Sequence, residues 1–191
     1  MNRQESALVQ VARLLEDGGV PYMIIGGMAN AIWGVPRATL DVDVTVWTGS
    51  SDPTALIALF DGPFRIRPAD PVSFVLDTRV LPVETLEGVR VDVVLGLLPF
   101  EEEAIRRSVL REVGDWHARF CTAEDLVLLK ILSERPRDLD DVRAIIGRQA
   151  AFLDRAYLDP RVRELSDLLE RPEIEQNYRQ WLELAARGVR K

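Results

Sequence analysis

Cysteine and long apolar runs are nearly missing from this sequence of 191 residues. Cys121 is the only cysteine, so an intramolecular disulfide and a zinc site built from cysteines are both excluded. No stretch approaches the roughly 20 consecutive apolar residues that a transmembrane helix needs. We therefore expect a cytoplasmic protein without a membrane span.

Lysine is also scarce. Lys130 and Lys191 are the only lysines among 24 cationic residues, and the others are arginines. Because Lys191 is the C-terminal residue, Lys130 is the single internal lysine, which indicates either a site that needs a compact charge or chance. The formal net charge of −7 argues against broad, non-specific binding of nucleic acid, but it leaves room for a local basic patch.

What the sequence does contain is typical of a folded globular protein, with 47% apolar and 29% charged residues. Apolar periodicity and turn residues predict alternating helices and short strands in the first two thirds, followed by mainly helical sequence. We expect helices over 4–17, 28–33, 52–60, 100–111 and 123–133, and strands over 20–25, 37–48, 72–76, 89–95 and 118–121. We also expect two further helices, one beginning at Asp159-Pro160 and one at Pro172.

Two aspartates stand out in the strand predicted over 37–48. Residues two apart on a strand point to the same face, so Asp41 and Asp43 share a face with Thr45. Carboxylates placed this close repel each other and raise each other's pKa unless a cation lies between them. The alternative is a solvated strand face, because the pattern Asp-x-Asp is common by chance.

Two other features lie in the same region of the predicted fold. Gly26-Gly27 ends the first strand at the start of a helix, where a phosphate could approach the backbone. Asp92 interrupts the apolar strand predicted over 89–95, and a buried carboxylate there needs a partner, a metal or an exposed edge. Three carboxylates on neighbouring strands could hold two divalent metals, an arrangement used for phosphoryl transfer, and Asp92 could also act as a general base.

These residues resemble a known family. Gly26-Gly27 followed by Arg37-x-Thr39-x-Asp41-x-Asp43 is similar to the minimal nucleotidyltransferases of the DNA-polymerase-β-like superfamily. The later run Glu124-Asp125-Leu126-x-x-x-Lys130, with Arg137-Asp138-x-x-Asp141, resembles the AbiEii-type toxin branch of that superfamily. The motifs extend over about residues 20–147.

The resemblance implies an α+β fold, in which a small mixed β-sheet core (residues 1–121) is flanked by helices and a helical C-terminal region (122–191) packs on it. It implies two Mg²⁺ ions and an NTP as donor, with transfer of the NMP to an acceptor hydroxyl. The acceptor would be tRNA, and an antitoxin would be the partner. The resemblance implies triphosphate contact by Gly26 and Gly27, metal binding by Asp41 and Asp43, and phosphate contact by Lys130. Beside it, we expect Asp92 to join Asp41 and Asp43 in metal binding and catalysis, Lys130 to take part in catalysis, and Arg37 and Thr39 to contact the nucleotide.

Several alternatives stay open at this stage. The acceptor could be a small molecule such as an aminoglycoside, or the domain could be inactive and bind only a nucleotide or a protein. Arg37 could contact phosphate or pair with a surface carboxylate. Asp138 and Asp141 could orient Lys130 by binding its ammonium, or they could form the N-cap and capping box of a helix.

Overall fold

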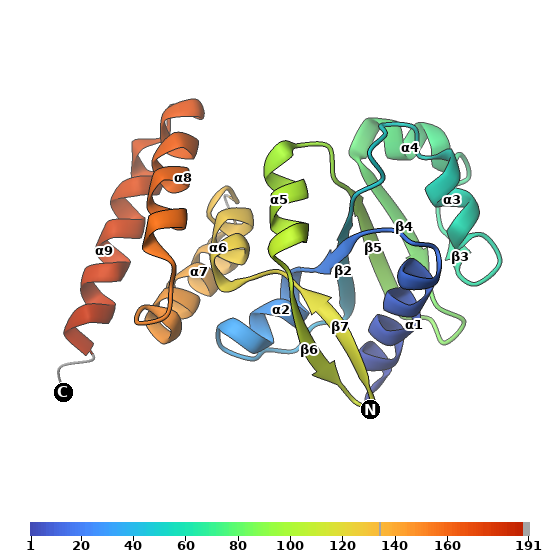
Figure 1. Cartoon of the computed structure of the whole chain (residues 1–191), viewed down its shortest axis with the longest axis horizontal. Coiled ribbons are helices and arrows are strands. Elements are labelled where there is room, and N and C mark those ends of the chain that lie inside the picture. The colour runs from blue at the N-terminus through green and yellow to red at the C-terminus, as the bar shows by residue number, and fades with distance from the viewer. Residues whose placement is uncertain (134, 189–191) are drawn as a thin grey trace. The chain divides into compact units, whose positions relative to one another are not determined.

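The structure is a computed structural model that describes residues 1–133 and 135–188. Within these residues, seven strands form one mixed sheet in the order β3-β4-β5-β2-β1-β7-β6 (Figure 1). β2 pairs in parallel with β5, and β1 pairs in parallel with β7, whereas the other neighbours are antiparallel. The strands are β1 (Tyr22–Ile24), β2 (Asp41–Val46), β3 (Arg65–Ile66), β4 (Val80–Glu84), β5 (Arg90–Leu95), β6 (Val109–Val113) and β7 (Trp116–Phe120).

The described chain separates into two compact units. The first contains the sheet and comprises Met1–Ala29 and Ala38–Cys121, and the second contains Asn30–Arg37 and the chain from Thr122 onward. The helices of the first unit are α1 (Arg3–Asp17), α3 (Thr54–Phe60), α4 (Pro71–Thr78) and α5 (Pro99–Arg107). The predicted α+β class with a mixed sheet and flanking helices is confirmed.

The two faces of the sheet differ in burial, and this difference positions the site. On β2 and β5 one face is closed: its six side chains are at most 2% exposed, namely Val42, Val44, Val46, Val91, Val93 and Leu95. The opposite face carries Asp41, Asp43 and Asp92, all partly exposed. Here this second face is called the open face. The strand period of two therefore puts every valine of β2 in the core and both of its aspartates on the open face.

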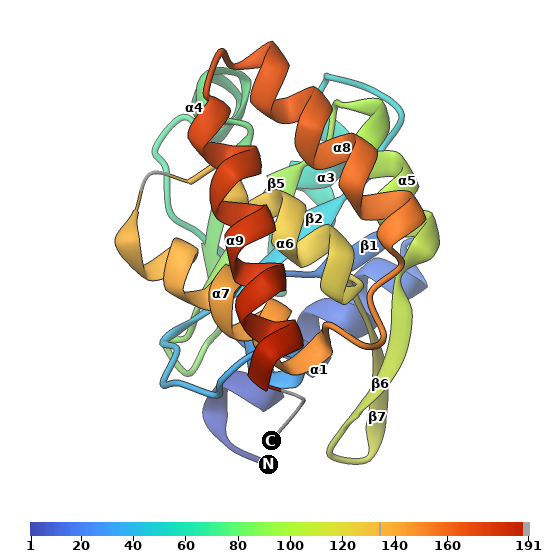
Figure 2. The ribbon, with the colours of Figure 1, turned by 90° about the vertical axis from the view of Figure 1, so that its left-hand side faces the viewer.

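The second unit is helical. It contains α6 (Ala123–Ile131), α7 (Pro136–Gln149), α8 (Arg155–Leu168) and α9 (Pro172–Gly188), and α8 and α9 run side by side (Figure 2). α2 (Gly26–Trp33) is divided, because its residues from Asn30 onward belong to this unit. α7 holds that segment: Arg148 Nη1 donates to the Gly34 carbonyl at 2.7 Å and Gln149 Nε2 donates to the Trp33 carbonyl at 3.1 Å.

Three predictions of local structure were wrong, each because capping or pairing outweighed periodicity. The strand predicted over 72–76 is α4, since Asp70 accepts a hydrogen bond from the Ser73 amide and Pro71 starts the helix. The helix predicted over 100–111 ends at Arg107, and the following residues form β6 against β7.

The third error concerns α8. This helix begins at Arg155, since Asp154 accepts from the Tyr157 amide, so Pro160 lies inside the helix and does not open it. The starts predicted for α6 and α9 are confirmed at Ala123 and Pro172. None of the helices in the described residues combines the length and hydrophobicity needed to span a bilayer.

Candidate functional site

The three predicted aspartates lie together on the open face. In the parallel pairing of β2 with β5, Asp43 is directly opposite Asp92, and Asp41 is opposite Arg90. Paired residues in a sheet project to the same side, so the carboxylates of Asp41, Asp43 and Asp92 share one face of two adjacent strands. Here these three residues are called the carboxylate group.

The pKa of Asp92 is shifted by its surroundings in this arrangement. Burial raises the pKa of its carboxyl, the nearby charge of Asp41 raises that pKa further, and Arg90 acts in the opposite direction. A carboxyl with a raised pKa holds a proton more readily than an ordinary aspartate, which suits a group that accepts a proton during a reaction.

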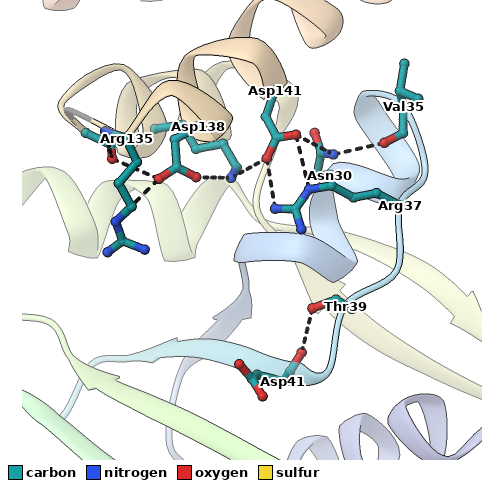
Figure 3. Close-up of polar contacts among 10 residues, drawn as sticks. Asn30, Val35, Arg37, Thr39, Asp41, Arg135, Asp138 and Asp141 are labelled. Atoms are coloured by element: carbon teal, nitrogen blue, oxygen red, sulfur yellow. Dashed lines mark hydrogen bonds and ion pairs between the residues drawn. The ribbon is translucent and has the colours of Figure 1, made fainter.

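The side chains around the carboxylate group leave no room for a Cβ at Gly26 or Gly27. Gly26 has a φ of +62°, and a Cβ built on it would collide with the carboxylate of Asp43. A Cβ on Gly27 would lie 2.6 Å from Oγ1 of Thr39, which donates to the Asp41 carbonyl at 3.1 Å (Figure 3). In the structure Asp43 and Thr39 occupy the space that side chains at positions 26 and 27 would need.

The donor chemistry of the carboxylate group fits Mg²⁺, which prefers oxygen ligands. In the part of the chain that the structure describes, no three or more His, Cys, Asp or Glu side chains converge as they would around an ion. Mg²⁺ is usually held by one or two carboxylates together with substrate phosphates and water, so a complete cage of protein side chains is not needed. Asp41, Asp43 and Asp92 are the residues that would supply the protein's oxygens.

The other predicted site residues lie in the second unit, where they form a buried ionic cluster. Lys130 Nζ donates to Asp138 Oδ1 and to Asp141 Oδ2, both at 2.8 Å, and the Lys130 side chain is only 8% exposed. Asp138 also accepts from Ser133 Oγ at 2.8 Å. Burial alone would raise the pKa of Asp138, but the hydrogen bonds from Lys130 and Ser133 outweigh it and lower that pKa.

Asp141 is the centre of this cluster (Figure 3). Its carboxylate accepts from Arg37 at 3.0 and 3.3 Å and from Asn30 Nδ2 at 3.1 Å, besides Lys130. Burial opposes ionisation of Asp141, yet the donors Arg37 and Lys130 lower its pKa overall. Arg37 Nη1 and Asn30 Oδ1 are buried and have no hydrogen-bond partner among residues 1–133 and 135–188.

The helix-cap alternative for Asp138 and Asp141 is wrong. α7 begins at Pro136 with Arg135 as its N-cap, because proline is favoured in the first turn of a helix. The carboxylates of Asp138 and Asp141 are therefore free to bind Lys130. Asn30 was not predicted as part of this cluster, although a lone amide in the otherwise apolar segment 28–33 is a sequence signal that could have identified it. Asn30 is fully buried in the structure, and a buried amide needs hydrogen-bond partners.

The Glu124-Asp125 motif has a structural explanation within the second unit. Asp125 is fully buried and accepts from Thr122 Oγ1 at 2.7 Å and from the Tyr157 hydroxyl at 2.6 Å. Glu124 Oε1 accepts from the Asp154 amide at 2.8 Å. Both residues thus connect the start of α6 with the start of α8.

Solved structures with a similar arrangement provide an independent comparison. The antibiotic-resistance factor ANT(2'')-Ia matches 93% of this chain and 96% of its own, with a TM-score of 0.56 and 14% identity. A nucleotidyltransferase-like protein from Paracoccidioides brasiliensis matches 91% of both chains, with a TM-score of 0.52 and 17% identity. The chain has a nucleotidyltransferase-like fold.

A third structure agrees with these two. The lincosamide antibiotic adenylyltransferase LnuA matches 76% of this chain and 96% of its own, with a TM-score of 0.50 and 13% identity. At such identities the likeness concerns the fold alone. No protein-family profile matches the sequence, and no curated protein matches it. The nucleotidyltransferase fold expected from the motifs is confirmed, whereas none of the three neighbours is described as an AbiEii-type toxin.

Proposed function

We propose that this protein is a nucleotidyltransferase that moves an NMP from an NTP to an acceptor hydroxyl. The observation that carries the proposal is the register of β2 and β5, which puts Asp43 opposite Asp92 on the face that also bears Asp41. A likeness to nucleotidyltransferases in fold supports the same reaction class. The second support is Gly26, whose missing side chain makes room for the Asp43 carboxylate.

In the proposed reaction Asp92 accepts the proton of the acceptor hydroxyl, and the resulting oxygen attacks the α-phosphorus of the NTP. The bond from that phosphorus to the bridging oxygen breaks in line, and pyrophosphate leaves. Mg²⁺ bound by Asp41, Asp43 and Asp92 would neutralise the triphosphate and lower the pKa of the hydroxyl. Asp41 and Asp43 fix the position of the donor relative to Asp92, because all three project from paired strands.

The roles of Lys130 and Arg37 follow from the ionic cluster. Two of the three N–H donors of Lys130 already bind Asp138 and Asp141, which leaves one donor for a phosphate oxygen. Arg37 is held by Asp141 and keeps Nη1 for a further acceptor. We propose that Asp138 and Asp141 hold Lys130, and that Asp141 holds Arg37, with these remaining donors open to a phosphate.

Two acceptor classes deserve testing. The Lys130 and Asp138 motifs resemble AbiEii-type toxins, which supports tRNA as acceptor and an antitoxin as partner. The neighbours ANT(2'')-Ia and LnuA support a small antibiotic-like acceptor, and the net charge of −7 would attract a cationic one. Each class predicts a different labelled product from the same enzyme.

The decisive experiment incubates the protein with each of the four α-³²P-labelled NTPs, Mg²⁺ and either total tRNA or a panel of aminoglycosides and lincosamides. We expect labelled acceptor and free pyrophosphate, both abolished by Asp43→Asn and by EDTA. Asp77→Asn, which alters an exposed aspartate of α4, serves as the matched control. Label transfer by Asp43→Asn equal to that of the unaltered protein would contradict the proposal, and so would an absence of transfer to every acceptor.

A further inference from the structure

A row of alternating charges crosses four strands on the open face. Arg65 of β3 pairs with Glu84 of β4, Glu84 pairs with Arg90 of β5, and Arg90 pairs with Asp41 of β2. Since paired residues project to the same side, the row leads from the β3 end of the sheet to the carboxylate group. Adjacent strands are about 4.8 Å apart, so the backbones of Arg65 and Arg90 are separated by roughly 10 Å.

The two arginines differ from Glu84 in their contacts. Glu84 already binds a cation, because Arg67 Nη1 donates to its Oε2 at 2.6 Å. The side chains of Arg65 and Arg90 are exposed, and neither makes a hydrogen bond or an ion pair within the described residues. Arg90 influences Asp92 only through its charge. Two guanidinium groups on the open face are therefore available for an external anion, and Arg90 is directly opposite Asp41 of the carboxylate group.

We propose that Arg65 and Arg90 bind phosphates of a polynucleotide acceptor and deliver its 3′ hydroxyl to the carboxylate group. The inference rests on the proposed function and specifies its acceptor class. Guanidinium groups bind phosphate in a bidentate manner, and they repel a polycationic acceptor. With backbones roughly 10 Å apart, the two long side chains can contact different phosphates of one strand.

A direct binding measurement tests the row without requiring turnover. The probe is a fluorescein-labelled single-stranded RNA of 12 nucleotides with a free 3′ hydroxyl, and its affinity for the full-length protein is measured by anisotropy between 50 and 200 mM KCl. Each phosphate contact on a single strand contributes about 0.7 to the slope of log K against log salt. We expect Arg65→Gln with Arg90→Gln to weaken binding several-fold and to lower the slope by about 1.4.

The matched control is Arg106→Gln. Arg106 is another exposed arginine of the first unit without an ion pair among the described residues, but it lies on α5 and outside the row. We expect Arg106→Gln to lower the slope by less than the double variant of Arg65 and Arg90 does. A thermal unfolding midpoint for each variant verifies that the exposed substitutions leave the fold intact. Equal slopes for the control and the double variant would overturn the inference.

The donor NTP is the other source of phosphate, and a second arm of the test distinguishes it. Binding of ATP with Mg²⁺ is measured by calorimetry, and we expect the double variant to keep the affinity of the unaltered protein. A loss of ATP affinity with an unchanged RNA slope would assign the row to the donor and overturn the inference. If the unaltered protein transfers label to RNA but the double variant and the control have equal slopes, the proposed function stands and only the assignment of Arg65 and Arg90 to RNA binding is wrong. If the slope falls but no nucleotide is transferred to any acceptor, the proposed function is wrong and the row still binds RNA.

Discussion

The ammonium of Lys130 lies 2.8 Å from the carboxylate of Asp141, and both side chains are only 8% exposed. The same ammonium lies 2.8 Å from Asp138, so one cation joins two carboxylates that are one helical turn apart on α7. An arginine would present a planar fork of larger size at this position, whereas a lysine presents a compact charge with three donors. This geometry is a physical reason for a lysine in a chain whose other internal cations are all arginines.

Lys130→Met should destabilise the second unit strongly, because it leaves the carboxylates of Asp138 and Asp141 without their shared cation. Breaking a buried ion pair by removing one partner costs about 3 kcal/mol or more. Arg187→Met is the matched control, since Arg187 and Glu183 form an i,i+4 pair that is 77% and 70% exposed. Such a pair contributes less than about 0.5 kcal/mol. Urea unfolding followed by circular dichroism measures the free energy of unfolding of both variants. Equal losses of that free energy would show that the buried ion pairs of Lys130 contribute no more than the exposed pair of Arg187.

Acid should weaken the same cluster. The pKa of Asp141 is lower in the folded protein than in the unfolded chain, so its ionised form contributes stability above the ordinary aspartate pKa of about 3.9. That contribution is lost as the pH falls below about 4 and through the lower folded pKa. We expect the free energy of unfolding to fall in this window, and Asp141→Asn to be less stable at pH 7 but less sensitive to acid. Asp140→Asn, an exposed neighbour on α7, should retain the acid sensitivity of the unaltered protein.

The sequence predicted the common face of Asp41 and Asp43 because that face depends on a short-range rule. The period of two in β2 puts Asp41 and Asp43 on one face, and the valines between them identify the buried face. Only the register with β5 had to come from the structure. The ionic cluster behaves differently: Asn30 and Asp141 are 111 positions apart, and their contact depends on how α7 folds back onto residues 30–37. No local pattern encodes such a contact.

The errors in secondary structure have a related origin. Residues 72–76 are rich in strand-forming side chains, yet Asp70 and Pro71 start a helix there, and the hydrogen bond of one cap outweighed the propensity of five residues. The end of α5 was missed because Val109 and its neighbours pair with β7 across a turn. Periodicity identifies elements with a long, regular apolar stripe, whereas short elements depend on caps and partners.

Asp92→Asn should make the protein more stable and inactive at the same time. Burial and the charge of Asp41 raise the pKa of Asp92, so its ionised form destabilises the fold at neutral pH and the penalty disappears as Asp92 is protonated. Removing the charge should therefore stabilise the protein by roughly 0.5 kcal/mol or more, while transfer is lost. Mg²⁺ should raise the thermal midpoint of the unaltered protein more than that of the variant. A less stable Asp92→Asn would contradict the like-charge repulsion inferred for the carboxylate group.

Gly26→Ala and Gly49→Ala separate backbone strain from the role of the diglycine. Both glycines have a left-handed backbone, with φ of +62° and +68°, so backbone strain alone should make alanine at either position cost about 1–2 kcal/mol of stability. A Cβ at position 49 meets no atom within 4 Å, whereas a Cβ at position 26 collides with the Asp43 carboxylate. We therefore expect Gly49→Ala to keep its transfer rate and Gly26→Ala to lose about a hundredfold, as a displaced catalytic group does. Equal rates in the two variants would show that Asp43 tolerates displacement, and the carboxylate group would then not be the centre of the reaction.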